Sequence, residues 1–178
     1  MEGNRILLDE KAMERSINRI THEILEKNHG AGNLSLIGIR TRGVFLAKRV
    51  QDKVRAIENR ELSLGILDIT MYRDDIATLK TPQVKKTDIT FNLNDINIVL
   101  VDDVLHTGRT TRAAIDAIMD LGRPNTIQLA VLVDRGSRQL PIQPDYTGIF
   151  HTAGPKEEIF VKLRETDDRD EVVLTTSL

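Results

Sequence analysis

The fold of this chain is decided by Ile98-Val99-Leu100-Val101-Asp102-Asp103-Val104-Leu105-His106-Thr107-Gly108-Arg109-Thr110-Thr111. The apolar residues that open this stretch predict a buried strand over 96–101, which delivers two adjacent carboxylates at its carboxyl end. A turn is predicted over 102–111 and a helix over 111–121, which Gly122-Arg123-Pro124 ends. Ligands of open α/β sheets lie at this edge, and the free N–H groups of a helix N-terminus suit an anion. The segment therefore predicts a phosphate site, with backbone N–H groups and threonine hydroxyls from Thr107 to Thr111 as donors.

The rest of the chain alternates between helix and strand patterns. Apolar residues at helical spacing predict one helix from about residue 9 to residue 28, with Asp9 as its N-cap, and another after residue 43. Their apolar stripes are Met13, Ile17, Ile20 and Ile24 in the first helix, and Ala47, Val50, Val54 and Ile57 in the second. Strands are predicted over 34–39, 62–71, 96–101, 127–133, 147–150, 159–163 and 171–174. A polar stretch from 76 to about 87 is expected to be mobile. This alternation predicts an α/β domain with a mainly parallel sheet.

The composition narrows the class of protein. A chain of 178 residues with 40% hydrophobic residues is expected to form one globular domain over 1–178. No apolar run approaches the roughly 18 residues of a membrane span, and no membrane partner is expected. The absence of cysteine excludes thiol catalysis and zinc–thiolate sites, and with an N-terminus that lacks an apolar signal core it predicts a cytoplasmic protein. A net charge of −2 and only 3% aromatic residues argue against a wholly basic or base-stacking nucleic-acid binder.

The single motifs identify no site by themselves. Adjacent Asp residues at a strand end are often only solvated turn acids, a glycine after a strand commonly serves only a turn, and Arg73-Asp74-Asp75 could be an exposed charged loop. No Walker loop is present, which lowers an ATPase or GTPase interpretation. His22 and Glu26 have helical spacing but no third ligand nearby, so no metal site is predicted there.

Taken together, however, the motifs resemble a known family. Residues 101–110 are similar to the phosphoribosyl-pyrophosphate loop of the type I phosphoribosyltransferases. Residues 38–43, 67–75 and 129–136 are similar, in order, to the PyrR family of bifunctional pyrimidine operon attenuation proteins and uracil phosphoribosyltransferases. The resemblance implies a type I phosphoribosyltransferase fold: a mainly parallel sheet flanked by helices, with a mobile loop and a small hood. It also implies transfer of uracil to phosphoribosyl pyrophosphate, which gives UMP and pyrophosphate, and UMP-responsive binding to the leader of pyrimidine messenger RNA.

The same resemblance implies a role for each part of the site. Asp102 and Asp103 are expected at the ribose hydroxyls and Arg73 over the pyrophosphate, as the catalytic residues. The substrate phosphates are expected to contact Thr41, Arg42, Gly43, Val104, Leu105, His106, Thr107, Gly108, Arg109, Thr110 and Thr111. The nucleotide base is expected near Asp134, Arg135 and Ile159. Mg²⁺ is expected to be ligated mostly by substrate and water, so no protein metal site is predicted.

RNA contacts are implied for the polar side of the first helix, although such a face is usually only solvated. The residues expected to bind RNA are Arg15, Asn18, Arg19, His22 and Arg138. Three positions depart from the family pattern, namely Ser137, Gln143 and Ile149, the last within the altered run 148–154. Loss of cations at such positions predicts weaker RNA binding with a flatter salt dependence.

Two interpretations of the function therefore stay open. In the first, the chain has both activities. In the second it has one, as an enzyme with weakened RNA binding or as a nucleotide-sensing RNA-binding regulator with little catalysis. A homo-oligomer, dimer or tetramer, is expected from the resemblance.

Overall fold

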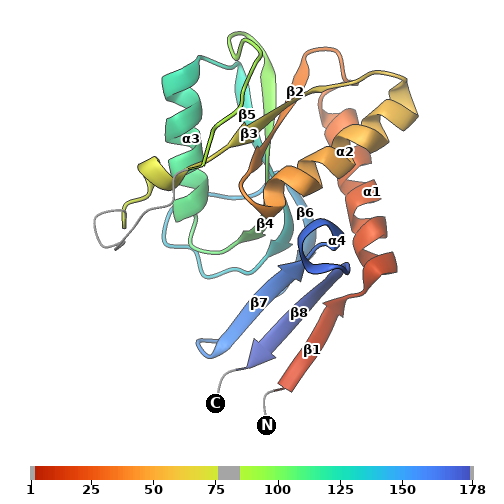
Figure 1. Cartoon of the computed structure of the whole chain (residues 1–178), viewed down its shortest axis with the longest axis vertical. Helices are drawn as coiled ribbons and strands as arrows, with labels where there is room; N and C mark the ends of the chain where they lie inside the picture. Colours follow the sequence, from red (N-terminus) through yellow and green to blue (C-terminus); the bar gives the residue numbers. More distant parts are fainter. Residues whose placement is uncertain (1–2, 76–84, 177–178) are drawn as a thin grey trace.

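The computed structural model describes residues 3–75 and 85–176, and its centre is a five-stranded parallel sheet (Figure 1). In the order in which they lie side by side, the strands are β3 (Ser63–Leu67), β2 (Leu34–Ile39), β4 (Asn97–Leu105), β5 (Thr126–Asp134) and β6 (Tyr146–Phe150). Every neighbouring pair is parallel, so all five carboxyl ends meet at one edge. The predicted α/β class is confirmed. Most of the polar stretch that was expected to be mobile, residues 76–84, lies outside the described residues.

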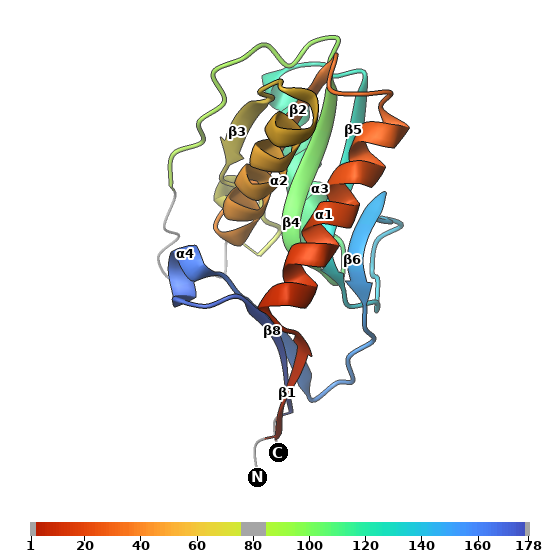
Figure 2. The same cartoon turned by 90° about the vertical axis from the view of Figure 1, so that its right-hand side faces the viewer.

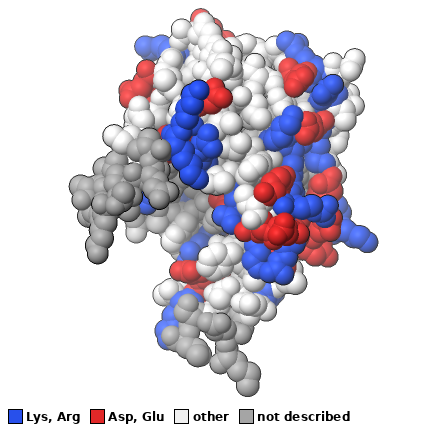
Figure 3. All heavy atoms as spheres, viewed as in Figure 1, with Lys and Arg blue, Asp and Glu red and all other residues white. Residues whose placement is uncertain are grey.

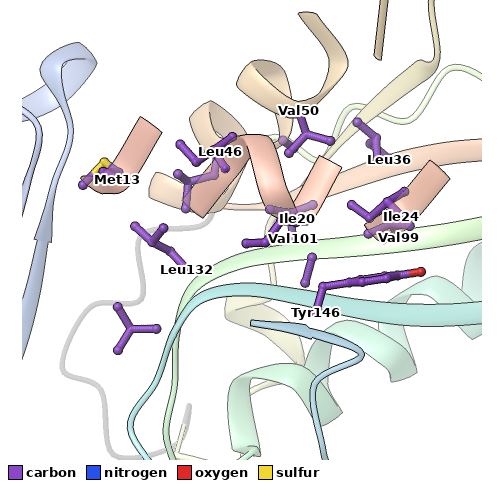
Figure 4. Close-up of a cluster of buried hydrophobic side chains, with 14 of the residues drawn as sticks. Met13, Ile20, Ile24, Leu36, Leu46, Val50, Val99, Val101, Leu132 and Tyr146 are labelled. Carbon is purple, nitrogen blue, oxygen red and sulfur yellow. The ribbon is translucent and has the colours of Figure 1, made fainter. Parts of the chain in front are cut away.

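Helices cover both faces of this sheet (Figure 2). Helices α1 (Glu10–Lys27) and α2 (Arg42–Glu58) pack on one face, and α3 (Arg109–Leu121) packs on the other. Strand side chains alternate between the two faces. Leu36, Val99 and Val101 contribute to the core beneath α1 and α2 (Figure 4), whereas Ile37 and Leu100 lie under α3. The predicted N-cap is confirmed, since the Asp9 carboxylate accepts the N–H of Ala12 at 2.7 Å.

A second, smaller sheet forms the hood. Its antiparallel strands are β1 (Gly3–Leu8), β8 (Glu171–Thr176) and β7 (Glu157–Lys162), and the short helix α4 (Arg164–Asp167) joins β7 to β8. Ion pairs join the hood to α2. Arg49 of α2 donates to Glu165 of α4 at 2.9 and 2.6 Å and to Asp170 at 3.0 and 2.7 Å. Charges of both signs gather where α4 meets the helices (Figure 3). The hood is therefore held firmly against the helical side of the sheet.

Several predicted boundaries are wrong. Strand β4 continues to Leu105, because pairing with β5 extends to Leu105 opposite Asp134, so Asp102 and Asp103 lie in the strand and not in the turn. Helix α3 accordingly begins at Arg109. Strand β3 ends at Leu67. The carboxylate of the next residue, Asp68, accepts the N–H of Thr70, and the 3-10 helix η1 (Thr70–Tyr72) starts there.

Two further differences concern single elements. Ile57, expected on the buried stripe of α2, is 47% exposed because it lies in the last turn of the helix. Strand β1 was not predicted at all. No helix in the described part of the chain is long and apolar enough to cross a membrane.

Candidate active site at the carboxyl edge of the sheet

A cleft of about 320 Å³ opens where β2, β3 and β4 end. Six of the predicted residues line it together: Thr41, Arg73, Asp102, Asp103, Val104 and Thr110. The other lining residues are Ile39, Arg40, Asp68, Ile69, Thr70 and Lys85. The structure thus joins segments far apart in the sequence in one cavity, at the sheet edge where the strand pattern placed it.

The two adjacent carboxylates in the cleft differ in their surroundings. Asp102 is 8% exposed, whereas Asp103 is half-buried. The Asp102 carboxylate accepts the N–H of Asp103 at 2.9 Å, and the Asp103 carboxylate accepts the N–H of Val104 at 2.8 Å. Burial, followed by the charge of Asp103, raises the pKa of Asp102 well above its usual range. The surroundings of Asp102 therefore disfavour its ionised form.

The phosphate turn, residues 106–111, joins β4 to α3. Gly108 has a φ of 91°, in the left-handed region that favours glycine. The first helical hydrogen bond of α3 runs from the N–H of Arg112 to the Gly108 carbonyl at 2.9 Å. Among the described residues, the N–H groups of Thr107 and Gly108 have no protein acceptor. A cavity of about 170 Å³ faces the turn, lined by residues 104–108 with Thr110 and Thr111. The turn can therefore bind an anion through backbone donors.

Residues 41–43, where the resemblance places the pyrophosphate of the substrate and which we call the pyrophosphate turn, begin α2 directly against β4. A Cβ on Gly43 would lie 2.4 Å from the Val101 carbonyl oxygen and 3.2 Å from Cα of Asp102, so only glycine permits this approach. The Arg42 side chain is engaged by the hood, because its Nη2 donates to both carboxylate oxygens of Asp167 at 3.0 and 3.1 Å. The ion pair occupies Nη2 of Arg42, and the contact of this residue with substrate stays a prediction.

Arg73 follows η1 and lines both the cleft and a second cavity beside Thr107 and Arg109. Its guanidinium donates to Asp75 at 2.8 and 2.7 Å, and hydrogen bonding to this carboxylate raises the pKa of Arg73. Its side chain is 44% exposed. Arg73 therefore carries a firmly protonated, accessible guanidinium at the mouth of the cleft.

Asp68 is a cleft residue that was not predicted. Its carboxylate accepts the N–H of Thr70 at 2.8 Å, the Thr70 hydroxyl at 2.5 Å and the N–H of Lys85. Burial alone would raise the pKa of Asp68, but these hydrogen bonds outweigh it and lower the pKa. Asp68 thus ties together the two described ends of the segment that carries Arg73. This aspartate directly follows the observed strand β3, but it lies inside the strand predicted over 62–71, so an acidic residue within a predicted strand was the available signal.

The three residues expected near the base lie where the sheet meets the hood. Asp134 is the last residue of β5 and Arg135 follows it, and the Arg135 guanidinium donates to the Glu157 carbonyl at the start of β7 at 2.7 Å. Ile159 in β7 is 9% exposed and packs in the hydrophobic core. Their contact with a nucleotide stays a prediction.

The residues expected to bind RNA divide into two groups. Arg15, Asn18 and His22 are exposed on α1, and their side chains have no partner within the described part of the chain. Arg19, by contrast, donates to Glu23 at 2.9 Å and to the β6 carbonyls of Thr147 and Gly148. The α1 face can therefore offer polar groups to a partner without first breaking contacts at most of its positions.

The Arg138 side chain turns inward and bonds four groups of the protein, so the structure does not support its predicted contact with RNA. Ser137 and Gln143 are exposed, as a partner surface requires. Ile149 is partly buried and packs against the core, and its place on an RNA surface stays a prediction.

Comparison with known proteins agrees with this geometry. The phosphoribosyl transferase domain family matches residues 3–166. The structure is similar to the hypoxanthine phosphoribosyltransferase of Trypanosoma cruzi, with a TM-score of 0.72 at 17% identity over 98% of this chain and 97% of that one. A hypoxanthine phosphoribosyltransferase from Staphylococcus aureus gives 0.71 at 18% identity, over 97% of this chain and 92% of that one. The fold is that of a type I phosphoribosyltransferase, and the chain belongs to the phosphoribosyl transferase domain family.

Closer relatives define the family. The chain is 53% identical over 169 residues to the bifunctional protein PyrR of Pelotomaculum thermopropionicum, covering 94% of this chain and 93% of the relative. It is 49% identical over 174 residues to the bifunctional protein PyrR of Halalkalibacterium halodurans, covering 96% and 97%. The chain belongs to the PyrR family.

Proposed function

We propose that the cleft joins uracil to C1 of phosphoribosyl pyrophosphate, forming UMP and releasing pyrophosphate, and that UMP bound there controls binding of pyrimidine leader RNA. The enzymatic part is supported above all by the order in which the carboxylates and the phosphate turn follow one another along strand β4. β4 brings Asp102 and Asp103 into the cleft and continues directly into the phosphate turn, whose N–H groups face a cavity of their own. A ribose between two phosphate groups needs this order of donors and acids.

The charges of the site suit this reaction. Breaking the bond from C1 to pyrophosphate builds positive charge on the ribose and negative charge on the leaving group. Asp103 supplies the anion beside the ribose, and Arg73 with the N–H groups of the pyrophosphate turn supplies the positive side for the diphosphate. The phosphate turn holds the far end of the substrate, so that catalysis rests on positioning as well as charge.

Magnesium fits the site as an ion that the substrate brings with it. No group of three or more candidate ligands occurs within residues 3–75 and 85–176, but the cleft does hold the carboxylates of Asp102 and Asp103. Mg²⁺ commonly binds through one or two carboxylates, substrate phosphates and water, and when bound it would neutralise charge on the pyrophosphate. Asp103, the more open of the two, is the carboxylate that would reach it, directly or through water.

The regulatory part of the proposal is supported by the surface of α1. Arg15, Asn18 and His22 offer a cationic and polar face, and Ser137 and Gln143 are also exposed. Because neither Ser137 nor Gln143 is a cation, we expect RNA affinity to be modest and its salt dependence shallow.

A panel of bases tests the enzymatic part. The protein is incubated with phosphoribosyl pyrophosphate, Mg²⁺ and uracil, hypoxanthine or orotate, and nucleotide formation is followed by chromatography. UMP formation from uracil is expected. Absence of UMP alongside robust turnover of hypoxanthine or orotate would reject the assignment of uracil.

Gel-shift titration of a pyrimidine leader hairpin tests the regulatory part. Binding is expected to tighten with UMP and to weaken as salt rises. A titration that UMP does not change would leave the enzyme as the only function. An Arg15→Gln variant, which removes one unpartnered cation from α1, is expected to weaken RNA binding and leave uracil transfer unchanged.

A further inference from the structure

A segment outside the cleft, residues 138–142, lies along the outer side of the phosphate turn and donates hydrogen bonds to its carbonyl groups. The Thr107 carbonyl accepts the N–H groups of Gln139 at 3.0 Å and Leu140 at 3.1 Å. The His106 carbonyl accepts Nη1 of Arg138 at 3.0 Å. We call residues 138–142 the outer segment.

These bonds fix the direction of the N–H groups on the other side of each peptide. In a trans peptide the C=O and the following N–H point in opposite directions. Among the described residues the only cis peptide is Arg40–Thr41, so the two peptides at issue are trans. A His106 carbonyl held outward therefore turns the Thr107 N–H inward, and a Thr107 carbonyl held outward does the same for Gly108. The two donors aimed at the cavity are thus oriented by the outer segment.

Arg138 is the side chain that ties this arrangement to the rest of the site. Its Nη2 donates to the Asp134 carboxylate at 2.7 Å and its Nε to the Ile142 carbonyl at 2.9 Å, in addition to the bond to His106. The side chain is only 15% exposed and that of Asp134 is 10% exposed. One buried guanidinium therefore joins the end of β5, the outer segment and the phosphate turn.

We propose that Arg138 is a positioning residue for the 5′-phosphate site, which orients the N–H donors of the phosphate turn through the His106 carbonyl. The inference rests on the proposed function, since it takes the 5′-phosphate of the substrate as the ligand of that turn. It gives Arg138 a role on the inner side of the protein in place of a contact with RNA.

The geometry requires an arginine and not merely a cation. The planar guanidinium donates in three directions at once, to His106, Asp134 and Ile142, whereas the single ammonium of lysine on a flexible stem cannot reproduce this fork. A role in attracting the phosphate by charge alone would be restored by lysine. A role in positioning the phosphate turn would not be restored by lysine.

The experiment compares R138Q and R138K with R123Q, a control that also removes one positive charge. Arg123 is exposed and its side chain has no partner within the described residues. Steady-state uracil transfer gives KM for phosphoribosyl pyrophosphate, and product inhibition gives Ki for pyrophosphate, which binds at the opposite end of the cleft. R138Q and R138K are both expected to raise KM about 10- to 100-fold, the equivalent of one charge-assisted hydrogen bond. Ki for pyrophosphate and all constants of R123Q are expected to change less than about twofold.

Calorimetric titration with ribose 5-phosphate, which carries the phosphate but no pyrophosphate, decides the inference separately from the reaction. Affinity is expected to fall at least about tenfold in R138Q and R138K. Unchanged affinity would overturn the inference, and so would equal losses for ribose 5-phosphate and pyrophosphate, or recovery in R138K. A parent protein that binds ribose 5-phosphate but transfers no uracil would refute the proposed function and leave this inference standing. R138K retains the charge and serves if R138Q does not fold.

Discussion

Substitution of Gly43 by alanine tests the close contact on which the pyrophosphate turn depends. The new Cβ would lie 2.4 Å from the Val101 carbonyl oxygen, about 1 Å short of ordinary van der Waals contact. The obstacle is backbone in the central strand β4, so the start of α2 must move outward by a similar distance. Such overpacking costs about 1–3 kcal/mol of stability. A displacement of about 1 Å at a substrate-positioning turn costs about 100-fold in activity.

The assay measures urea unfolding and kcat/KM for phosphoribosyl pyrophosphate in Gly43→Ala and in Gly32→Ala. Gly32 is a matched control, because a Cβ there meets nothing within 4 Å. We expect Gly43→Ala to lose about 100-fold in kcat/KM and Gly32→Ala to stay near the parent in both measurements. An active, stable Gly43→Ala protein would show that the turn does not need this approach to β4.

Three further predictions address the acids and the partner surface. Asp103→Asn is expected to lower turnover by about 100-fold or more without changing the unfolding midpoint, and parental kinetics would remove Asp103 from the mechanism. The Thr166 hydroxyl, followed by other hydrogen bonds, lowers the pKa of Asp167 to about 2. The stability from Asp167 is therefore complete above the ordinary carboxyl pKa and lost as pH falls through about 2. Asp167→Asn should then unfold more easily than the parent at pH 7, with a difference that shrinks below about pH 4; a constant difference would exclude this ionisation. The double variant Ser137→His and Gln143→Arg is expected to tighten RNA binding and steepen the salt slope by about 0.7 to 0.9 per regained contact, with uracil transfer unchanged. Gel shifts at several salt concentrations measure it, and unaltered binding would refute a role for this surface.

The elements that sequence predicts well are those whose pattern is local. Apolar stripes identified α1 and α2, and apolar runs identified β2, β4 and β5. Strand β1 was missed because its six residues pair only with β8, at the other end of the chain. The end of β4 was misplaced because Asp102 and Asp103 are polar residues that remain paired with β5 in the sheet.

The same distinction holds for the site. The phosphate turn was predictable because strand, glycine and helix start are adjacent in sequence. The roles of Asp68 and Arg138 were not, because each depends on hydrogen bonds to segments that only the fold brings near. An arginine in an exposed-looking loop carries no local sign that its side chain turns inward.

A crystal structure with UMP bound is the measurement that tests the central claim most directly. The claim is that β4 and the phosphate turn together hold a nucleotide. We predict the 5′-phosphate within hydrogen-bond distance of the N–H groups of Thr107 and Gly108, the ribose hydroxyls beside Asp103 and the uracil ring near Asp134. A UMP phosphate bound elsewhere, with the phosphate turn empty, would contradict the account.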